Sequence, residues 1–247
     1  MLATEALSKS FGSLDVARNV AITLPRGARH ALIGPNGAGK TSLINLITGQ
    51  LKPDSGRILL EGEDITGVAA AARVGRGLTR TFQINTLFPD LTPLEAVMLA
   101  VCERERAAGQ FWRRLSAHGQ AIDESFAILG QLGLTDVATR TTRTLPYGQQ
   151  RLLEIALALA TRPKMLLLDE PAAGVPKDES AMLFGVIAAL PADISVLFIE
   201  HDMDIVFRFA SRIIVLVAGR VLIEAEPDVV RTDPRVREVY LGKAGHV

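Results

Sequence analysis

Short apolar runs alternate with amphipathic segments along most of the chain. The runs typical of strands occupy 2–8, 14–24, 29–33, 57–60, 165–168 and 195–200. The segments with apolar residues at helical spacing occupy 40–49, 178–190 and 204–210. Apolar strands separated by helices are typical of a mainly parallel sheet covered on both faces, so the pattern predicts an α/β fold.

The middle of the chain, 88–162, differs because helical spacing dominates there. Helices are expected over 93–107, 121–132 and 149–161. We therefore expect one domain over 1–247, in which a helical lobe at 88–162 is inserted between core segments 1–87 and 163–247. The core should end with a hairpin at Ala218-Gly219 and two short helices that begin at Pro227 and Pro234.

Composition narrows the class of protein. Hydrophobic residues make up 48% of the 247 residues, which is enough for a sizeable core. Lys+Arg and Asp+Glu both number 27, a balance that argues against nucleic acid as the main partner. The single cysteine, Cys102, excludes an intrachain disulfide and suits a reducing compartment. A mean hydropathy of +0.25 indicates an apolar surface for a bound partner.

Membrane insertion is not indicated by the sequence. The first residues contain no basic stretch followed by an apolar one, so we expect no signal peptide. The longest apolar runs, such as 181–190, are shorter than the ~18 residues of a spanning helix. We therefore expect a chain that is soluble by itself.

A glycine-rich loop provides the most specific motif. The segment 34–41, GPNGAGKT, follows an apolar strand and begins a helix, as the phosphate-binding P-loop requires. Glycines let successive N–H groups point at phosphate oxygens, while the helix dipole favours the same anion. Lys40 would reach the outer phosphates of ATP, and the Thr41 hydroxyl would ligate Mg²⁺. The alternative is a glycine-rich turn without a ligand. The residues expected to contact the nucleotide are Gly34, Pro35, Asn36, Gly37, Ala38, Gly39, Lys40, Thr41 and Ser42.

Paired carboxylates end a second apolar strand. Asp169 and Glu170 follow the run 165–168. In P-loop folds this strand lies beside the phosphate loop, where Asp169 would hold Mg²⁺ and Glu170 would act as general base on the attacking water. The alternative is a strand followed by a solvated acidic turn.

Three further segments, in chain order, carry a family resemblance. Segment 145–151 (LPYGQQR) precedes the acidic strand at the spacing of the signature motif of ABC transporter ATPases. Segment 79–83 (TRTFQ) is similar to that family's Q-loop, and 199–202 (IEHD) to its H-loop. The chain therefore resembles an ABC nucleotide-binding domain over nearly its whole length. The resemblance implies a P-loop NTPase (RecA-like) core with an antiparallel β subdomain and an inserted helical subdomain.

Within that family the chain resembles the branched-chain amino-acid importer branch, the LivG-like ATPases. The segments that carry this finer resemblance are 80–83, 145–148, 170–174, 200–203 and 233–242. Importers for urea and other amides, and lipopolysaccharide-export ATPases, share much of this pattern and stay open as alternatives.

The resemblance implies roles for isolated residues. Phe11 matches an aromatic that stacks on adenine, with an ordinary core Phe as the alternative. Gln83 would contact Mg²⁺ and the attacking water, unless it is a plain surface residue. His201 would bind the γ-phosphate and orient the water, unless it is merely structural.

The signature segment implies a second subunit. In the family two domains face head to tail, and the amides of Gly148 and Gln149, where a helix starts, would bind the γ-phosphate held by the partner. Two positions depart from the family pattern. Pro146 replaces the usual serine, so it offers neither a hydroxyl nor an N–H group, and Pro176 replaces the usual Asp or Asn.

The expected function is that of the ATP-hydrolysing subunit of an ABC importer for branched-chain amino acids or similar solutes. The implied partners are a second copy or a paralogous ATPase, transmembrane permease subunits and, indirectly, a solute-binding protein. The implied location is the cytoplasmic face of the inner membrane. One rival is a soluble ABC protein of translation or DNA repair, which usually has two motors or a long coiled coil. Another is a GTPase or small-molecule kinase, disfavoured because no Asn-Lys-x-Asp segment is present.

Overall fold

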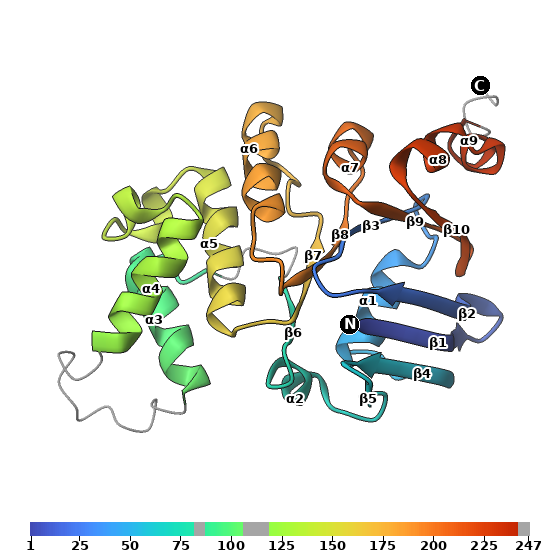
Figure 1. The fold of residues 1–247 in the computed structure, drawn as a ribbon, viewed down its shortest axis with the longest axis horizontal. Coiled ribbons are helices and arrows are strands. Elements are labelled where there is room, and N and C mark those ends of the chain that lie inside the picture. Colours follow the sequence, from blue (N-terminus) through green and yellow to red (C-terminus); the bar gives the residue numbers. More distant parts are fainter. Residues whose placement is uncertain (82–86, 106–118, 242–247) are drawn as a thin grey trace. The chain divides into compact units, whose positions relative to one another are not determined.

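The computed structural model describes residues 1–81, 87–105 and 119–241 (Figure 1). The chain divides into two compact units, which we call the first and the second unit. The first unit comprises Met1–Arg80, Lys164–Glu170 and Pro191–Val247, and the second comprises Thr81–Pro163 and Pro171–Leu190. The expected α/β class is confirmed, and the domain limits set from the sequence stay a prediction. Among the helices of the described ranges, none is long and apolar enough to cross a membrane.

A six-stranded sheet forms the centre of the first unit. Its order is β10-β9-β3-β8-β7-β6. The strands are β3 (Arg29–Ile33), β6 (Leu78–Arg80), β7 (Met165–Asp169), β8 (Ser195–Ile199), β9 (Arg212–Val217) and β10 (Arg220–Ala225). All neighbours pair in parallel except β10, which returns antiparallel along β9. The parallel strands β3, β6, β7 and β8 therefore end at one edge of the sheet, which is where ligands bind in open α/β folds.

A four-stranded antiparallel sheet accompanies it in the first unit, in the order β2-β1-β4-β5. Its strands are β1 (Leu2–Phe11), β2 (Leu14–Leu24), β4 (Ser55–Leu60) and β5 (Glu63–Asp64). The helix α1 (Lys40–Thr48) buries Leu43, Ile44, Leu46 and Ile47 in one apolar core with residues of both sheets. Helix α1, which follows the phosphate loop, is thus packed into the apolar core of the first unit.

The remaining helices of the first unit are α2 (Ala70–Val74), α7 (Met203–Phe209), α8 (Pro227–Thr232) and α9 (Pro234–Leu241). Figure 1 shows α7 and α8 on the face of the six-stranded sheet opposite α1. The hairpin at Ala218-Gly219 and the two helices that begin at proline are confirmed. Three short elements, β5, α2 and β6, were not expected, because two to five residues are too few to show a period.

A buried arginine fastens the C-terminal end of α1. Arg73, of α2, is 1% exposed, and its guanidinium donates to the carbonyl oxygens of Leu46 and Ile47 at 3.0 and 2.6 Å. It also donates to the carbonyls of Val68 and Thr66 at 2.8 and 2.9 Å. These bonds satisfy carbonyl groups that a helix end leaves without a partner, so α2 stabilises the helix of the phosphate loop.

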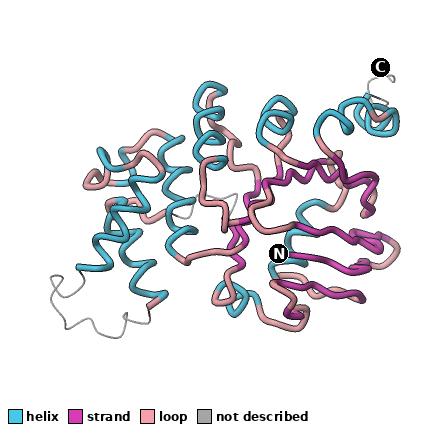
Figure 2. The backbone as a smooth tube through the Cα atoms, in the orientation of Figure 1, coloured by secondary structure: helices cyan, strands magenta, loops and turns pink. Residues whose placement is uncertain are grey.

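Helices and loops make up the described part of the second unit (Figure 2). Its helices are α3 (Pro93–Arg104), α4 (Gly119–Gln131), α5 (Tyr147–Ala160) and α6 (Lys177–Ala188), with short 3₁₀ turns at Thr135–Val137 and Thr142–Thr144. Helix α3 begins with a capping box between Thr92 and Glu95, and it packs against α4 and α5. The helices expected in this stretch are confirmed, although residues 106–107 of the first one lie outside the described ranges.

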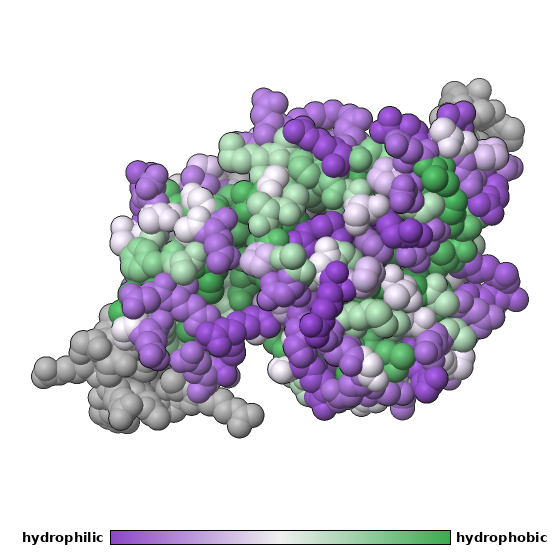
Figure 3. Space-filling view, in the orientation of Figure 1, coloured by the Kyte–Doolittle hydropathy of each residue, from purple (hydrophilic) through white to green (hydrophobic). Residues whose placement is uncertain are grey.

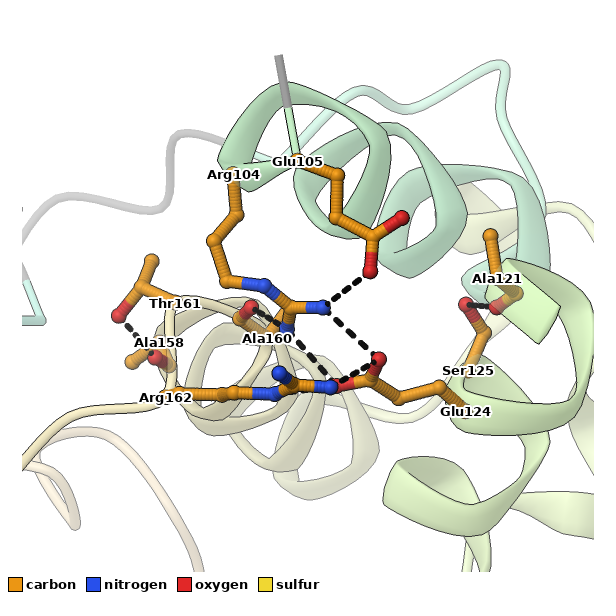
Figure 4. Close-up of polar contacts among 9 residues, drawn as sticks. All are labelled: Arg104, Glu105, Ala121, Glu124, Ser125, Ala158, Ala160, Thr161 and Arg162. Carbon is orange, nitrogen blue, oxygen red and sulfur yellow. Dashed lines mark hydrogen bonds and ion pairs between the residues drawn. The ribbon is translucent and has the colours of Figure 1, made fainter. Parts of the chain in front are cut away.

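Charged side chains join three helices of the second unit (Figure 4). Arg104, at the end of α3, donates to both carboxylate oxygens of Glu124 on α4, at 2.7 and 2.8 Å. It also donates to the carbonyl of Ala160 at the end of α5, at 2.7 Å. Arg162 reaches the same Glu124 carboxylate at 2.9 Å. These bonds fix the C-terminal ends of α3 and α5 to the middle of α4.

A buried histidine in β3 makes stability depend on pH. His30 is 1% exposed, and burial together with the charge of Arg212 lowers its pKa from an ordinary 6.5 to about 4. Its neighbour Glu224, 4.0 Å away, has a pKa raised by burial. The unfolded chain therefore binds a proton on His30 more tightly than the folded chain does. We expect protonation of His30 in the unfolded chain to lower the unfolding free energy by about 2 kcal/mol when the pH falls from 7.5 to 5.0.

Thermal or urea unfolding of the protein and of His30→Gln at both pH values measures this effect. The glutamine side chain does not titrate. The unfolding free energy of the variant should therefore fall by about 2 kcal/mol less than that of the wild type on acidification. The protonation of Glu224, whose pKa is raised, works in the opposite direction and stabilises the folded state on acidification. Equal losses in the two proteins would show that His30 does not titrate between the folded and unfolded states.

Candidate functional site

The glycine-rich loop 34–41 runs from the end of β3 into α1, as its motif predicts. Gly34 and Ala38 are buried, whereas Asn36, Gly37 and Thr41 are exposed. The Ala38 carbonyl accepts a hydrogen bond from Gly219 N–H in the β9–β10 turn, at 2.9 Å. The loop is thus tied to the turn that follows β9, the strand beside β3, while its tip stays accessible to a ligand.

Two glycines of this loop are required by close packing. A Cβ at Gly34 would overlap the carbonyl oxygen of Leu216, and one at Gly39 would overlap the carbonyl oxygen of Val16. Gly39 also has φ 102°, a backbone conformation that side chains disfavour. Strands β9 and β2 therefore hold the loop from two sides, and this fixes where its amide groups lie.

Lys40 lies at the first position of α1 and is 7% exposed. Its Nζ donates to the loop's own carbonyl oxygens at Gly34 and Pro35, at 2.8 and 3.2 Å. Burial lowers the pKa of the Lys40 amine, and the nearby Glu170 and Asp169 carboxylates act in the opposite direction. The lysine therefore holds a positive charge inside the loop and within electrostatic range of both carboxylates.

Asp169 ends β7 and is 4% exposed. Its Oδ2 accepts a hydrogen bond from Nη2 of Arg80 at 2.6 Å. Strand β7 does not pair with β3 as a direct neighbour, because β8 lies between them. Because the three strands are parallel, their carboxyl ends still share the edge of the sheet.

Glu170 and His201 meet at this edge. His201 Nε2 lies 2.9 Å from Glu170 Oε1. Glu170 is a non-glycine residue with φ 50°, and its N–H donates to the Ile199 carbonyl at the end of β8. A side chain in this sparsely populated conformation is a common feature of functional sites. Asp202 caps α7 through the N–H groups of Asp204 and Ile205, which fixes the backbone immediately after His201.

Phe11 ends β1 in the antiparallel sheet and is 54% exposed. It pairs with Leu14 across the hairpin, two residues before Val16, whose carbonyl touches Gly39. The Nζ of Lys9 lies 5.5 Å from the centre of its ring. Phe11 therefore presents an open aromatic face close to the phosphate loop rather than packing in the core, which leaves it able to stack on a base.

The oxygen donors at this edge suit magnesium bound together with a nucleotide. Mg²⁺ uses one or two protein oxygens and completes its shell with phosphates and water. The Thr41 hydroxyl and the Asp169 carboxylate are such donors. Across the described ranges no group of three or more His, Cys, Asp or Glu side chains could hold a metal by itself. The residues present thus fit a magnesium ion that arrives with phosphate groups.

The signature segment begins α5 in the second unit. The helix starts at Tyr147, with Pro146 as its N-cap at φ −52°. The expected start at Gln149 was therefore wrong, because proline fixes φ at a value suited to a helix entry. Gly148 and Gln149 lie within the first turn, and the first intrahelical bond runs from Gln150 N–H to the Pro146 carbonyl at 3.1 Å. The amides of this turn precede the hydrogen-bonded ladder and are free to bind an anion.

A pocket of about 250 Å³ lies at this helix start. A Cβ on Gly148 would lie 2.5 Å from Oε2 of Glu179, which comes from α6 in the same unit. The residues that line the pocket are Pro146, Gly148, Gln149, Leu152, Glu179, Met182 and Leu183. Gln83, the other residue predicted to act near the nucleotide, lies outside the described residues.

One charged residue at the sheet edge was missed as a site residue. In the sequence Arg80 belongs to the segments 79–83 and 80–83, and neither pattern gives this arginine a role of its own. Its position at the end of β6, beside β7, brings it to Asp169. A strand of three residues gives no periodic signal that could have placed it there.

Comparisons with known proteins agree with this geometry. A family model described as ABC transporter matches residues 17–173. The high-affinity branched-chain amino acid transport ATP-binding protein BraF of Pseudomonas aeruginosa is 37% identical over 253 residues, covering 99% of this chain and 98% of the relative. The corresponding protein LivG of Escherichia coli is 37% identical over 252 residues, with coverage of 99% and 98%.

A solved structure also matches the chain over nearly its whole length. The crystal structure of an ATP-binding cassette of an ABC transporter, in its ADP conformation, has a TM-score of 0.86 at 35% identity and covers 98% of both chains. The expected P-loop NTPase fold of the ABC type is thereby confirmed. The chain belongs to the ABC transporter family and is one of its ATP-binding subunits, an ATPase whose activity is coupled to transport.

Proposed function

We propose that this ATPase energises the import of branched-chain amino acids or similar small solutes. The two relatives named above are both branched-chain amino acid transport ATP-binding proteins, and each matches this chain over nearly its whole length. The observation in the structure that supports the proposal best is the convergence of Lys40, Asp169, Glu170 and His201 at one sheet edge. Those four side chains provide the charges and hydrogen bonds that hydrolysis of a γ-phosphate requires.

The phosphate loop would bind the nucleotide. Its exposed tip offers backbone N–H groups, and the N-terminal end of α1 favours the negative charge of the phosphates. Lys40 would exchange its hydrogen bonds to the Gly34 and Pro35 carbonyls for bonds to phosphate oxygens. Phe11 would stack on the adenine ring.

Glu170 would act on the attacking water. The carboxylate accepts the hydrogen bond, and finally the proton, of the water whose oxygen attacks the γ-phosphorus while the bond to the ADP oxygen breaks. His201, in contact with Glu170, would hold the water and a γ-phosphate oxygen in line. Mg²⁺ bound by Thr41 and Asp169 would neutralise charge on the phosphates.

A second subunit would complete the nucleotide site. The free amides of Gly148 and Gln149, at the start of α5, would bind the γ-phosphate of a nucleotide held by a partner ATPase. Pro146 provides no hydroxyl, so this contact rests on the backbone. The partner is a second copy or a paralogous ATPase in head-to-tail arrangement.

We expect Gly148→Asp to abolish ATP-driven dimerisation and to leave nucleotide binding by the monomer intact. The aspartate would bring a negative charge to the amides that receive the γ-phosphate, and it would also meet Glu179. Light scattering in the Glu170→Gln background, with and without MgATP, measures the mass. Glu179→Ala together with Gly148→Asp is the matched control, because it relieves the clash within the subunit and keeps the charge. ATP-driven dimers in the double variant would contradict the trans-binding role.

Membrane subunits are the other proposed partners. Large apolar side chains of the second unit are exposed, among them Phe88 at 62%, Leu99 at 48% and Met182 at 66%. The face drawn in Figure 3 likewise shows hydrophobic areas among hydrophilic ones. Such surfaces are typical of partner contacts. The proposed location is the cytoplasmic face of the inner membrane, where permease subunits hold the ATPase and receive solute from a solute-binding protein.

Affinity purification of the chain from detergent-solubilised membranes tests this function. We expect permease subunits to co-purify with it, and their import of leucine, isoleucine or valine to depend on this ATPase. Permeases of urea or amide import, or of lipopolysaccharide export, would instead assign the chain to a related ABC system. Recovery with ribosomes or DNA-repair proteins alone would contradict a role in transport.

A further inference from the structure

The guanidinium of Arg80 joins the acidic end of β7 to the phosphate-loop helix. Its Nη2 donates to Asp169 Oδ2 at 2.6 Å, while its Nη1 donates to Asn45 Oδ1 at 2.6 Å and to Gln50 Oε1 at 3.0 Å. We propose that Arg80 is a positioning residue, which orients the Asp169 carboxylate toward the phosphate loop and balances its charge before the magnesium nucleotide binds. This inference rests on the proposed function of the site.

The geometry favours a positioning role. Strand β6 is the edge strand beside β7, with Arg80 in register with Leu167, so the guanidinium can reach the carboxyl end of β7. The side chains of Arg80 and Asp169 are only 10% and 3% exposed. Losing one partner of a buried ion pair leaves the other charge buried without compensation, which is strongly destabilising. The carboxylate is therefore held in one orientation. The planar fork can satisfy Asp169 and Asn45 at the same time, which a lysine amine reaches less well.

The charge of Arg80 offsets part of the negative charge of the site. Lys40 and Arg80 contribute two positive charges to the sheet edge, and Asp169, Glu170 and the buried Glu200, which follows β8, contribute three carboxylates. Without Arg80 the same edge would become more negative, which repels a nucleotide that lacks magnesium and attracts the cation. Arg80 should thus control how strongly nucleotide affinity depends on Mg²⁺.

The test compares the Kd of ATP in EDTA with its Kd in excess Mg²⁺, measured by isothermal titration on Arg80→Gln, Arg80→Lys and the wild type. The ratio is the Kd in EDTA divided by the Kd in Mg²⁺. We expect this ratio to rise about tenfold in Arg80→Gln, as for loss of one unit charge a few ångströms away. Arg76→Gln is the matched control, because it removes the same charge at an exposed pair with Glu63. Its ratio should equal that of the wild type.

Arg80→Lys separates charge from orientation. It retains the charge, so its ratio should stay within about threefold of the wild type, whereas its kcat should fall about tenfold because the bridge to Asn45 is lost. A ratio in Arg80→Gln that matches Arg76→Gln would overturn the charge role. If Arg80→Gln does not fold, an unchanged kcat in Arg80→Lys would overturn the positioning role. Wild-type protein that binds no ATP in Mg²⁺ would contradict the proposed function itself.

Discussion

Glu170→Gln is expected to bind ATP and to hydrolyse it at less than about one hundredth of the wild-type rate, as for loss of a general base. Glutamine preserves the size of the side chain and can still hydrogen-bond His201, but it cannot accept a proton from water. The slow step should be chemistry rather than binding, so the Kd of ATP should stay within about threefold of the wild type. Phosphate release under saturating MgATP, together with equilibrium binding, measures both quantities.

Glu63→Gln is a matched control for this variant. Glu63 is an exposed carboxylate of β5 that pairs with Arg76, so the substitution removes the same charge outside the sheet edge. Its turnover should equal that of the wild type. Normal turnover by Glu170→Gln would show that another group activates the water.

Lys40→Ala is expected to lose most of its affinity for ATP. The amine is the buried positive charge within the phosphate loop, and charge-assisted bonds to phosphate contribute about 3 kcal/mol, so Kd should rise about a hundredfold. The substitution also removes the bonds to the Gly34 and Pro35 carbonyls, and a thermal melt must therefore show that the variant is folded.

Fluorescence titration with an ATP analogue measures the effect of Lys40→Ala. Lys52→Ala is the control, because Lys52 is an exposed lysine just beyond α1 and its loss changes net charge by the same amount. Unchanged nucleotide binding by Lys40→Ala would contradict the assignment of the phosphate loop.

The elements that could be predicted from the sequence are those with a strong local signal. The loop 34–41 places glycines where backbone carbonyls of other strands leave no room for a side chain. The run 165–169 is apolar because β7 is buried on both faces, so its two carboxylates stand out at the end. Helix α5 is found from its apolar period, although its first turn is not, because Pro146 rather than a polar cap sets the start.

The features that could not be predicted depend on contacts between segments distant in sequence. Arg73 caps α1 from 26 residues away, and Arg80 reaches Asp169 across 89 residues. No local pattern distinguishes either arginine from an exposed one. The positive φ of Glu170, whose N–H donates to Ile199 in the neighbouring strand, likewise occurs at a residue that is not a glycine.

The central claim is that hydrolysis at Lys40, Asp169, Glu170 and His201 energises solute import. It is tested most directly by rebuilding the transporter from this chain, its co-purified permease and its solute-binding protein in liposomes, with ATP on the side of the ATPase. Radioactive leucine should accumulate only with ATP, and Glu170→Gln should reduce uptake and phosphate release together. Uptake that continues at the wild-type rate with Glu170→Gln, or without ATP, would contradict the account.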